Sequence, residues 1–138
     1  MSQNKLLVDS DIYYSLIDRN DSNHKQVLLL NKKYLNKGIE FISLNLVIFE
    51  TATVLSHKIS QDAAVFFLQN TLSGKMEIIR LDELLEKEAL KFFIKQQRKN
   101  VSFVDCANMA LMKKLGLMTI FSFDKIYPKN GFKRIGID

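Results

Sequence analysis

Short apolar segments alternate with longer amphipathic segments along this chain of 138 residues, and the alternation limits the folds open to it. The apolar segments have the length and composition of β-strands. They are KLLVD (5–9), IEFIS (39–43), KMEIIRL (75–81), LMTIFSF (117–123) and FKRIGI (132–137). Strands that alternate with helices favour a mainly parallel sheet packed against helices. We therefore predict an α/β sandwich.

The segments between these strands have the apolar spacing of helices. The predicted helices are 11–19, 23–37, 44–58, 60–72, 81–99 and 102–116. Ser60 is expected to cap the fourth of them, and Gly38 and Gly116 to end two others. The stretch FDKIYPKNG (123–131) is expected to be a loop. In the second helix the side chains expected to face inward are Val27, Leu28, Leu30 and Leu35.

The composition indicates a single domain over residues 1–138. With 47% hydrophobic and 25% charged residues, the chain can bury a core of ordinary size. It has neither a signal-peptide pattern nor an apolar run of roughly 20 residues, so we expect no membrane association. A single cysteine, Cys106, cannot form an internal disulfide, which suits a reducing cytoplasm. The net charge of +5 is a weak indication of a polyanionic partner such as nucleic acid.

Four acidic residues occupy positions that a packed core would not select. Asp9 and Asp124 each close an apolar strand, Glu50 interrupts the apolar run LVIFETATVL, and Asp105 lies in the first turn of a helix. Each has an ordinary structural explanation when taken alone. Asp after a strand often starts a turn, Asp105 with Ser102 resembles a capping box, and Glu50 could point outward from its helix. We call the four the acid tetrad.

The tetrad gains significance as a set. If the strands are parallel, all four carboxylates can meet at one end of the sheet, where α/β proteins bind ligands. Two like charges 5 Å apart repel by roughly 3 kcal/mol at an effective dielectric constant of 20, so such a cluster would bind protons or cations. Carboxylate oxygens suit Mg²⁺ or Mn²⁺. The other eleven Asp and Glu residues stand against 20 Lys and Arg. An acidic pocket in a basic surface suits hydrolysis of a phosphodiester.

Four segments of the chain resemble the PIN domain family, most closely the single-domain VapC-type toxin ribonucleases. The segments are LLVDSDIYYSLIDRNDSNH (6–24), LNLVIFETATVL (44–55), VSFVDCANMALMKKLG (101–116) and TIFSFDK (119–125). The resemblance implies a three-layer α/β/α fold whose mainly parallel sheet has about five strands. It also implies that the tetrad of Asp9, Glu50, Asp105 and Asp124 binds Mg²⁺ or Mn²⁺ and is catalytic.

The resemblance extends to residues next to the tetrad. Ser122 matches a supporting polar residue near the metal, and Ser10 matches the small hydroxyl residue that commonly follows the first aspartate. Asp11 departs from the family pattern, which leaves it open as a metal ligand, a partner of a ligand or a helix cap. The basic residues expected to contact phosphates beside the cut are Arg98, Lys99, Lys125 and Lys129.

The function implied is that of a metal-dependent endoribonuclease, the toxin of a type II toxin–antitoxin pair, with an antitoxin partner and a homodimeric state. Two alternatives keep the PIN fold: an RNA-processing nuclease without a toxin role, and an inactive module that binds RNA or protein. A third is a haloacid-dehalogenase-type phosphatase, suggested by Asp9-Ser10-Asp11, although Tyr13 stands where that family usually has Thr.

Three other features have ordinary interpretations. Cys106 has no recognisable histidine partner and is expected to be a small buried residue rather than a nucleophile. His24 is expected to be structural or to flank the cleft. The phenylalanine pairs at 66–67 and 92–93 are mainly core, although two adjacent rings cannot both face one core, so some could line a partner groove.

Overall fold

The computed structural model describes residues 4–138, and its centre is a five-stranded sheet in which every pair of neighbouring strands is parallel. The order of the strands is β3-β2-β1-β4-β5. Their bounds are β1 Lys5–Val8, β2 Glu40–Leu44, β3 Glu77–Ile79, β4 Thr119–Phe121 and β5 Lys133–Arg134. The predicted α/β architecture and parallel sheet are confirmed.

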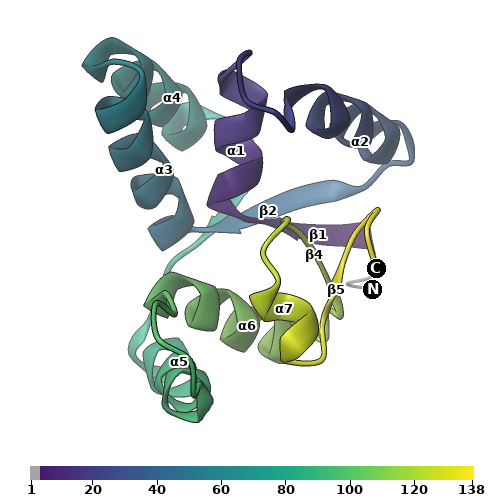
Figure 1. Ribbon diagram of the computed structural model, residues 1–138, viewed down its shortest axis with the longest axis vertical. Helices are drawn as coiled ribbons and strands as arrows, with labels where there is room; N and C mark the ends of the chain where they lie inside the picture. The colour runs from purple at the N-terminus through teal and green to yellow at the C-terminus, as the bar shows by residue number, and fades with distance from the viewer. Residues whose placement is uncertain (1–3) are drawn as a thin grey trace.

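Helices cover both faces of this sheet, which gives the predicted three layers (Figure 1). The helices are α1 Ser10–Ile17, α2 His24–Asn36, α3 Asn45–Lys58, α4 Gln61–Ser73, α5 Glu83–Lys95, α6 Phe103–Leu115 and α7 Ile126–Lys129. In Figure 1, α1 to α4 lie above the sheet and α5 to α7 below it. No helix in the described part of the chain has the length and apolar character needed to cross a membrane.

The central strand β1 is buried on both faces, which explains why its sequence is continuously apolar. Leu7 packs into the core shared with α5 and α6, whereas Leu6 and Val8 pack into a second core with Ile12 of α1 and Val27 of α2. All three strand residues are buried. A parallel strand covered on both faces has no polar side, so it reads as an apolar run rather than an alternating one.

The predicted helix ends agree with the structure at the positions that carried a capping signal. The Ser60 side chain accepts a hydrogen bond from the Ala63 amide at 3.0 Å, so Ser60 is the N-cap of α4. Gly38 and Gly116 have φ angles of 76° and 70°, in the left-handed region that glycine adopts readily. These residues therefore stop α2 and α6 where the sequence indicates.

Other predictions at this level were wrong. The segment 123–131, expected to be a loop, contains the short helix α7. The helix predicted over 81–99 is α5 and ends at Lys95. On α2, Leu28 and Leu35 are exposed, and Tyr34 is buried in their place against the Phe121 ring. The inward face of α2 is thus rotated from the one expected, because an aromatic residue fills the space above β4.

The chain order places a crevice at the carboxyl ends of β1 and β4. From β1 the chain builds outward through β2 and β3 on one side, and it returns to the other side of β1 with β4. Val8 is in register with Phe121, and the Asp9 amide donates to the Phe121 carbonyl at 3.0 Å. This reversal of direction is the switch point at which open α/β sheets bind ligands.

Candidate active site

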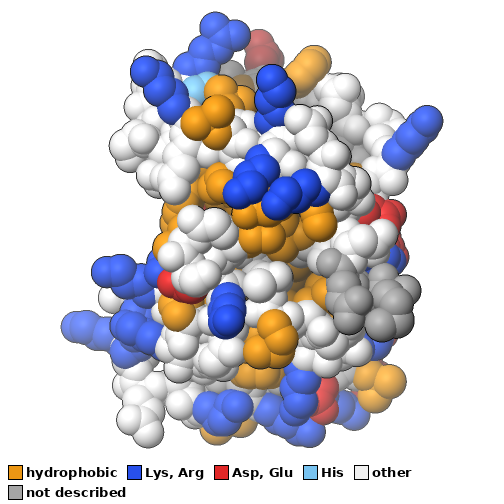
Figure 2. Space-filling view, turned by 90° about the vertical axis from the view of Figure 1, so that its right-hand side faces the viewer, with side chains coloured by type: hydrophobic (Ala, Val, Ile, Leu, Met, Phe, Trp, Pro, Cys, Tyr) orange, Lys and Arg blue, Asp and Glu red, His pale blue; other side chains and the backbone are white. Residues whose placement is uncertain are grey.

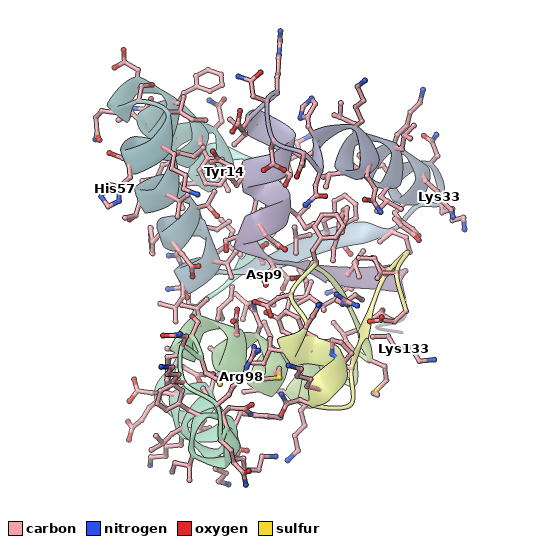
Figure 3. The ribbon with its side chains drawn as sticks, in the orientation of Figure 1. Asp9, Tyr14, Lys33, His57, Arg98 and Lys133 are labelled. Atoms are coloured by element: carbon pink, nitrogen blue, oxygen red, sulfur yellow. The ribbon has the colours of Figure 1, made fainter. Side chains whose placement is uncertain are left out.

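Asp9 follows β1 directly and lies buried at the switch point (Figure 3). Its carboxylate accepts four hydrogen bonds. Oδ1 accepts from the Ser10 amide at 2.8 Å and from Asn108 Nδ2 at 3.2 Å. Oδ2 accepts from the Tyr127 hydroxyl at 2.8 Å and from Ser122 Oγ at 3.1 Å. Donors from α1, α6, α7 and the end of β4 thus fix the orientation of this one carboxylate, although burial still raises its pKa.

Asp105 shows that the tetrad is brought together. It lies in the first turn of α6, and its pKa is raised to about 8, first by burial and then by the charges of Asp9, Asp124 and Glu50. The contacts agree with this. The Tyr127 hydroxyl lies between Asp9 and Asp105, at 2.8 and 3.3 Å. Glu50 accepts from Ser10, the residue after Asp9, and Ser122 Oγ lies between Asp9 and the Asp124 amide, 3.1 Å from each. Residues from β1, α3, α6 and the end of β4, far apart in the sequence, therefore share one negatively charged site.

The other two acids lie at the edge of this site. Glu50 projects from α3, accepts a hydrogen bond from Ser10 Oγ at 3.1 Å, and has a pKa raised by burial and by Asp9. Asp124 follows β4 and accepts from the Ile126 amide at 2.9 Å. Arg98 approaches Asp124 with its guanidinium 3.9 Å from the carboxylate.

Ser10 and Ser122, which the family resemblance implies are supporting residues, both lie next to the acids of the tetrad. The Ser10 hydroxyl links α1 to Glu50, and the Ser122 hydroxyl lies 3.1 Å from Asp9 Oδ2 and 3.3 Å from Asp11 Oδ2. Ser122 Oγ also accepts from the Asp124 amide at 3.1 Å. These two small hydroxyl residues connect the acids to one another.

Asp11 is not the helix cap that the sequence left open. The N-cap of α1 is Asp9, whose side chain accepts from the Ser10 amide. The Asp11 carboxylate instead accepts from the Phe123 amide at 2.8 Å through Oδ2, so it ties α1 to the segment after β4. Burial first, and then Asp9, raise its pKa to about 7. Its Oδ1 atom is buried without a donor among residues 4–138.

Tyr127 and Asn108 belong to the site, and sequence reasoning missed both. Tyr127 is fully buried on α7, and its hydroxyl lies 2.8 Å from Asp9 Oδ2 and 3.3 Å from Asp105 Oδ1. Asn108 donates to the same hydroxyl at 3.1 Å. Asn108 is three residues after Asp105 on α6, and this spacing, which puts both on one helix face, is a signal that could have been read. Tyr127 gave no such signal, because its helix was expected to be a loop.

Tyr127→Phe is expected to lower the free energy of unfolding by about 1–3 kcal/mol, because a buried carboxylate loses a donor. Urea unfolding monitored by circular dichroism measures the change. Tyr34→Phe is the matched control, since Tyr34 is also buried and its ring packs against Phe121. Equal effects of the two substitutions would show that the Tyr127 hydroxyl contributes nothing special to Asp9.

The donor set fits a divalent cation in charge and chemistry. All of the tetrad's donors are carboxylate oxygens, which Mg²⁺ and Mn²⁺ prefer, and their mutual repulsion is what a cation would relieve. As the side chains are placed, no three His, Cys, Asp or Glu side chains in the described part of the chain form a group that could hold a metal ion. Mg²⁺ usually needs only one or two carboxylates and completes its shell with water and phosphate. The site therefore fits such an ion without a complete set of protein ligands.

The four basic residues expected to contact RNA are all exposed. Of these, Arg98 is paired with a tetrad residue, Asp124. Lys125 precedes α7, the helix that carries Tyr127 into the site, and Lys129 is the last residue of that helix. Figure 2 shows the side of the molecule on which β1 begins, and that face carries many more Lys and Arg side chains than Asp and Glu.

Two residues with ordinary interpretations are structural. Cys106 lies on the buried face of α6, and burial, followed by Asp105, raises its pKa to about 11, which disfavours the nucleophilic thiolate. His24 Nδ1 lies 2.6 Å from the Ser15 carbonyl and joins α2 to α1. Neither contacts the tetrad through a hydrogen bond in the described residues.

Comparison with known proteins defines the class. The PIN domain model matches residues 6–133, so the chain belongs to the PIN domain family, whose members are metal-dependent nucleases. The predicted family and enzyme class are confirmed. The match also leaves the phosphatase alternative without support.

Within this family the chain is similar to particular toxins. It is 25% identical over 130 residues to the 23S rRNA-specific endonuclease VapC20 of Mycobacterium tuberculosis, covering 94% of this chain and 97% of the relative. The crystal structure of M. tuberculosis VapC20, described as a Sarcin-Ricin loop cleaving toxin, matches with a TM-score of 0.80 and 24% identity over 92% of this chain and 95% of that one. The structure of VapBC2 from Rickettsia felis bound to a promoter DNA fragment matches with a TM-score of 0.68 and 14% identity over 94% and 97%.

Proposed function

We propose that this protein is an Mg²⁺- or Mn²⁺-dependent endoribonuclease, formed by one PIN domain over residues 1–138, and the toxin of a type II toxin–antitoxin pair in the cytoplasm. The observation that carries the proposal is the convergence of the tetrad. The Tyr127 hydroxyl lies 2.8 Å from Asp9 and 3.3 Å from Asp105, and Ser10, which follows Asp9, donates to Glu50 at 3.1 Å. Perturbed carboxylates in a crevice at a switch point are typical of a catalytic centre. The similarity to an rRNA endonuclease over 94% of the chain favours RNA as the substrate.

In this proposal Asp9 and Asp105 contact the ion directly, and Glu50 and Asp124 act partly through water. The chemistry that such an ion supplies is activation of water for attack on phosphorus and neutralisation of charge on the phosphate. The chain's own contribution is orientation: four donors hold Asp9, and the Tyr127 hydroxyl spans Asp9 and Asp105. Arg98 would leave Asp124 to contact a phosphate beside the cut, with Lys99, Lys125 and Lys129 as further phosphate contacts.

The partners in this proposal are an antitoxin and a second copy of the chain. One phenylalanine of each adjacent pair is buried, Phe67 and Phe92, and the other, Phe66 or Phe93, is exposed. Exposed apolar side chains on α4 and α5 are the kind of surface that a protein partner covers. The name VapBC2 is that of a toxin–antitoxin complex, and this favours an antitoxin as one such partner.

Cleavage of RNA by the purified protein tests the proposal. The protein with Mn²⁺ is expected to cut an internal bond of total bacterial RNA, and excess EDTA is expected to stop the reaction. Induced expression of the same protein in a bacterial host is expected to arrest growth. Cleavage without growth arrest would favour the RNA-processing alternative. If the protein neither cleaves RNA nor arrests growth, the inactive binding module is the remaining alternative.

A further inference from the structure

A pocket adjoins the tetrad on its α1 and α3 side and is not used by the proposed chemistry. Its cavity volume is about 260 Å³, and its walls come from α1, the 18–23 loop, α3 and Phe123. Ser10 lines it, and Ser10 also donates to Asp9 through its amide and to Glu50 through its hydroxyl. Figure 3 shows Tyr14, another wall residue, on the helix that rises from Asp9. A molecule in this pocket would be next to the site of cleavage.

Two carboxylates in the wall are each held through one oxygen. Asp11 Oδ2 accepts from the Phe123 amide at 2.8 Å and lies 3.3 Å from Ser122 Oγ. Asp21 Oδ2 accepts from Ser15 Oγ at 2.7 Å and from the Asn23 amide at 3.1 Å. Within residues 4–138 no group donates to Oδ1 of either residue, and the Oδ1 atom of Asp11 is buried. Each carboxylate is therefore oriented by the protein and keeps one oxygen for another donor.

The same pocket has aromatic walls. The Tyr14 ring is held at its hydroxyl, which donates to Asp18 at 2.7 Å. Phe123, in the segment after β4, lines the same pocket. Val54 of α3 adds an apolar surface. Aromatic rings beside a cleft are the usual surface on which a protein stacks an unpaired RNA base.

The chemistry of the walls selects a base over a phosphate. Carboxylates repel phosphate, and the pocket has two of them, Asp11 and Asp21, against one cation. That cation, Lys58, lies over the Tyr14 ring, 5.2 Å from its centre. Carboxylate oxygens accept from the N–H groups of a base edge. Guanine offers two such groups side by side, an imino and an amino N–H, and the pocket offers one free carboxylate oxygen from each of Asp11 and Asp21. The volume is below that of a typical drug-sized pocket, which suits a single base.

We infer that this pocket binds one unpaired guanine base of the RNA, next to the bond that is cut. The inference rests on the proposed ribonuclease function and adds base selection to it. Asp11 and Asp21 accept from the base edge, Tyr14 and Phe123 contact its faces, and Ser10 connects the pocket to the tetrad.

Binding without cleavage tests the inference. Fluorescence anisotropy with EDTA present compares labelled heptanucleotides of sequence UUUGUUU, UUUAUUU, UUUCUUU and UUUUUUU, and a fifth with inosine in the central position. Wild type is expected to bind the guanine oligonucleotide about 10-fold more tightly than the adenine, cytosine and uracil ones, since a pair of hydrogen bonds to one base edge discriminates by about 1–3 kcal/mol. Inosine, which lacks the amino group, is expected to lose most of that preference.

Val54→Trp, which fills the pocket, is expected to lower affinity for the guanine oligonucleotide by about 10-fold and so to remove the guanine preference. Val65→Trp on α4 is the control, because Val65 is exposed and does not line this pocket. Equal binding of all five oligonucleotides, or a guanine preference that survives Val54→Trp, would overturn the inference. If wild type cleaves RNA but shows no base preference, the ribonuclease proposal holds and the guanine pocket is wrong. If it prefers guanine but does not cleave, the guanine pocket holds and the ribonuclease proposal is wrong.

Discussion

Asp105→Asn is expected to reduce RNA cleavage by roughly 100-fold or more and to abolish growth arrest on expression. The substitution removes one negative charge from the tetrad and keeps the size of the side chain. The Asn carbonyl oxygen can still accept from the Tyr127 hydroxyl, which lies 3.3 Å from Asp105 Oδ1. The loss would therefore report the missing charge rather than a change of shape. Single-turnover cleavage of a labelled RNA with Mn²⁺ measures it.

Asp62→Asn provides the matched control for this experiment. Asp62, like Asp105, is an acid in the first turn of a helix, but it is exposed on α4. The control substitution is expected to leave both cleavage and growth arrest unchanged. If Asp105→Asn cleaves as fast as wild type, the tetrad is not the catalytic centre.

The fold was predictable because its strands carry an unambiguous pattern. Strand β1 is buried on both faces, so Leu6, Leu7 and Val8 read as a continuous apolar run, and the glycines at 38 and 116 end helices by their backbone conformation. What failed was local. The face of α2 depends on whether Tyr34 or its leucine neighbours fill the space above β4, and the helical pattern fits either choice.

The site was predictable where position in the fold decides it. Asp9 and Asp124 follow adjacent parallel strands, so alternation of strands and helices was enough to bring them together. The hydrogen-bond network was not predictable in the same way. Tyr127 reaches Asp9 from a residue 118 positions away, on a four-residue helix without a periodic pattern. Asp11 ties α1 to Phe123, 112 positions away, which no local motif indicates.

Asp105→Asn is also expected to make the metal-free protein more stable at pH 8, by about 1–3 kcal/mol. The pKa of Asp105 rises from 3.8 to about 8 on folding. Between these values the folded protein binds a proton that the unfolded chain has released, so the stability of wild type falls as pH rises from about 4 to 8. Asparagine carries no charge and loses nothing over this interval. Thermal unfolding in EDTA at several pH values measures the difference.

The variant is expected to retain a shallower dependence on pH, because the pKa values of Asp9, Asp11 and Glu50 are raised as well. Mn²⁺ at pH 8 is expected to stabilise wild type more than the variant, since an ion that binds only the folded state shifts the unfolding equilibrium. If wild type is equally stable at pH 5 and pH 8 and the variant gains nothing, the four carboxylates do not repel one another. If the variant gains stability and loses cleavage, the folded protein holds mutually repelling carboxylates together at a cost in stability, and that arrangement is the one that binds the cation.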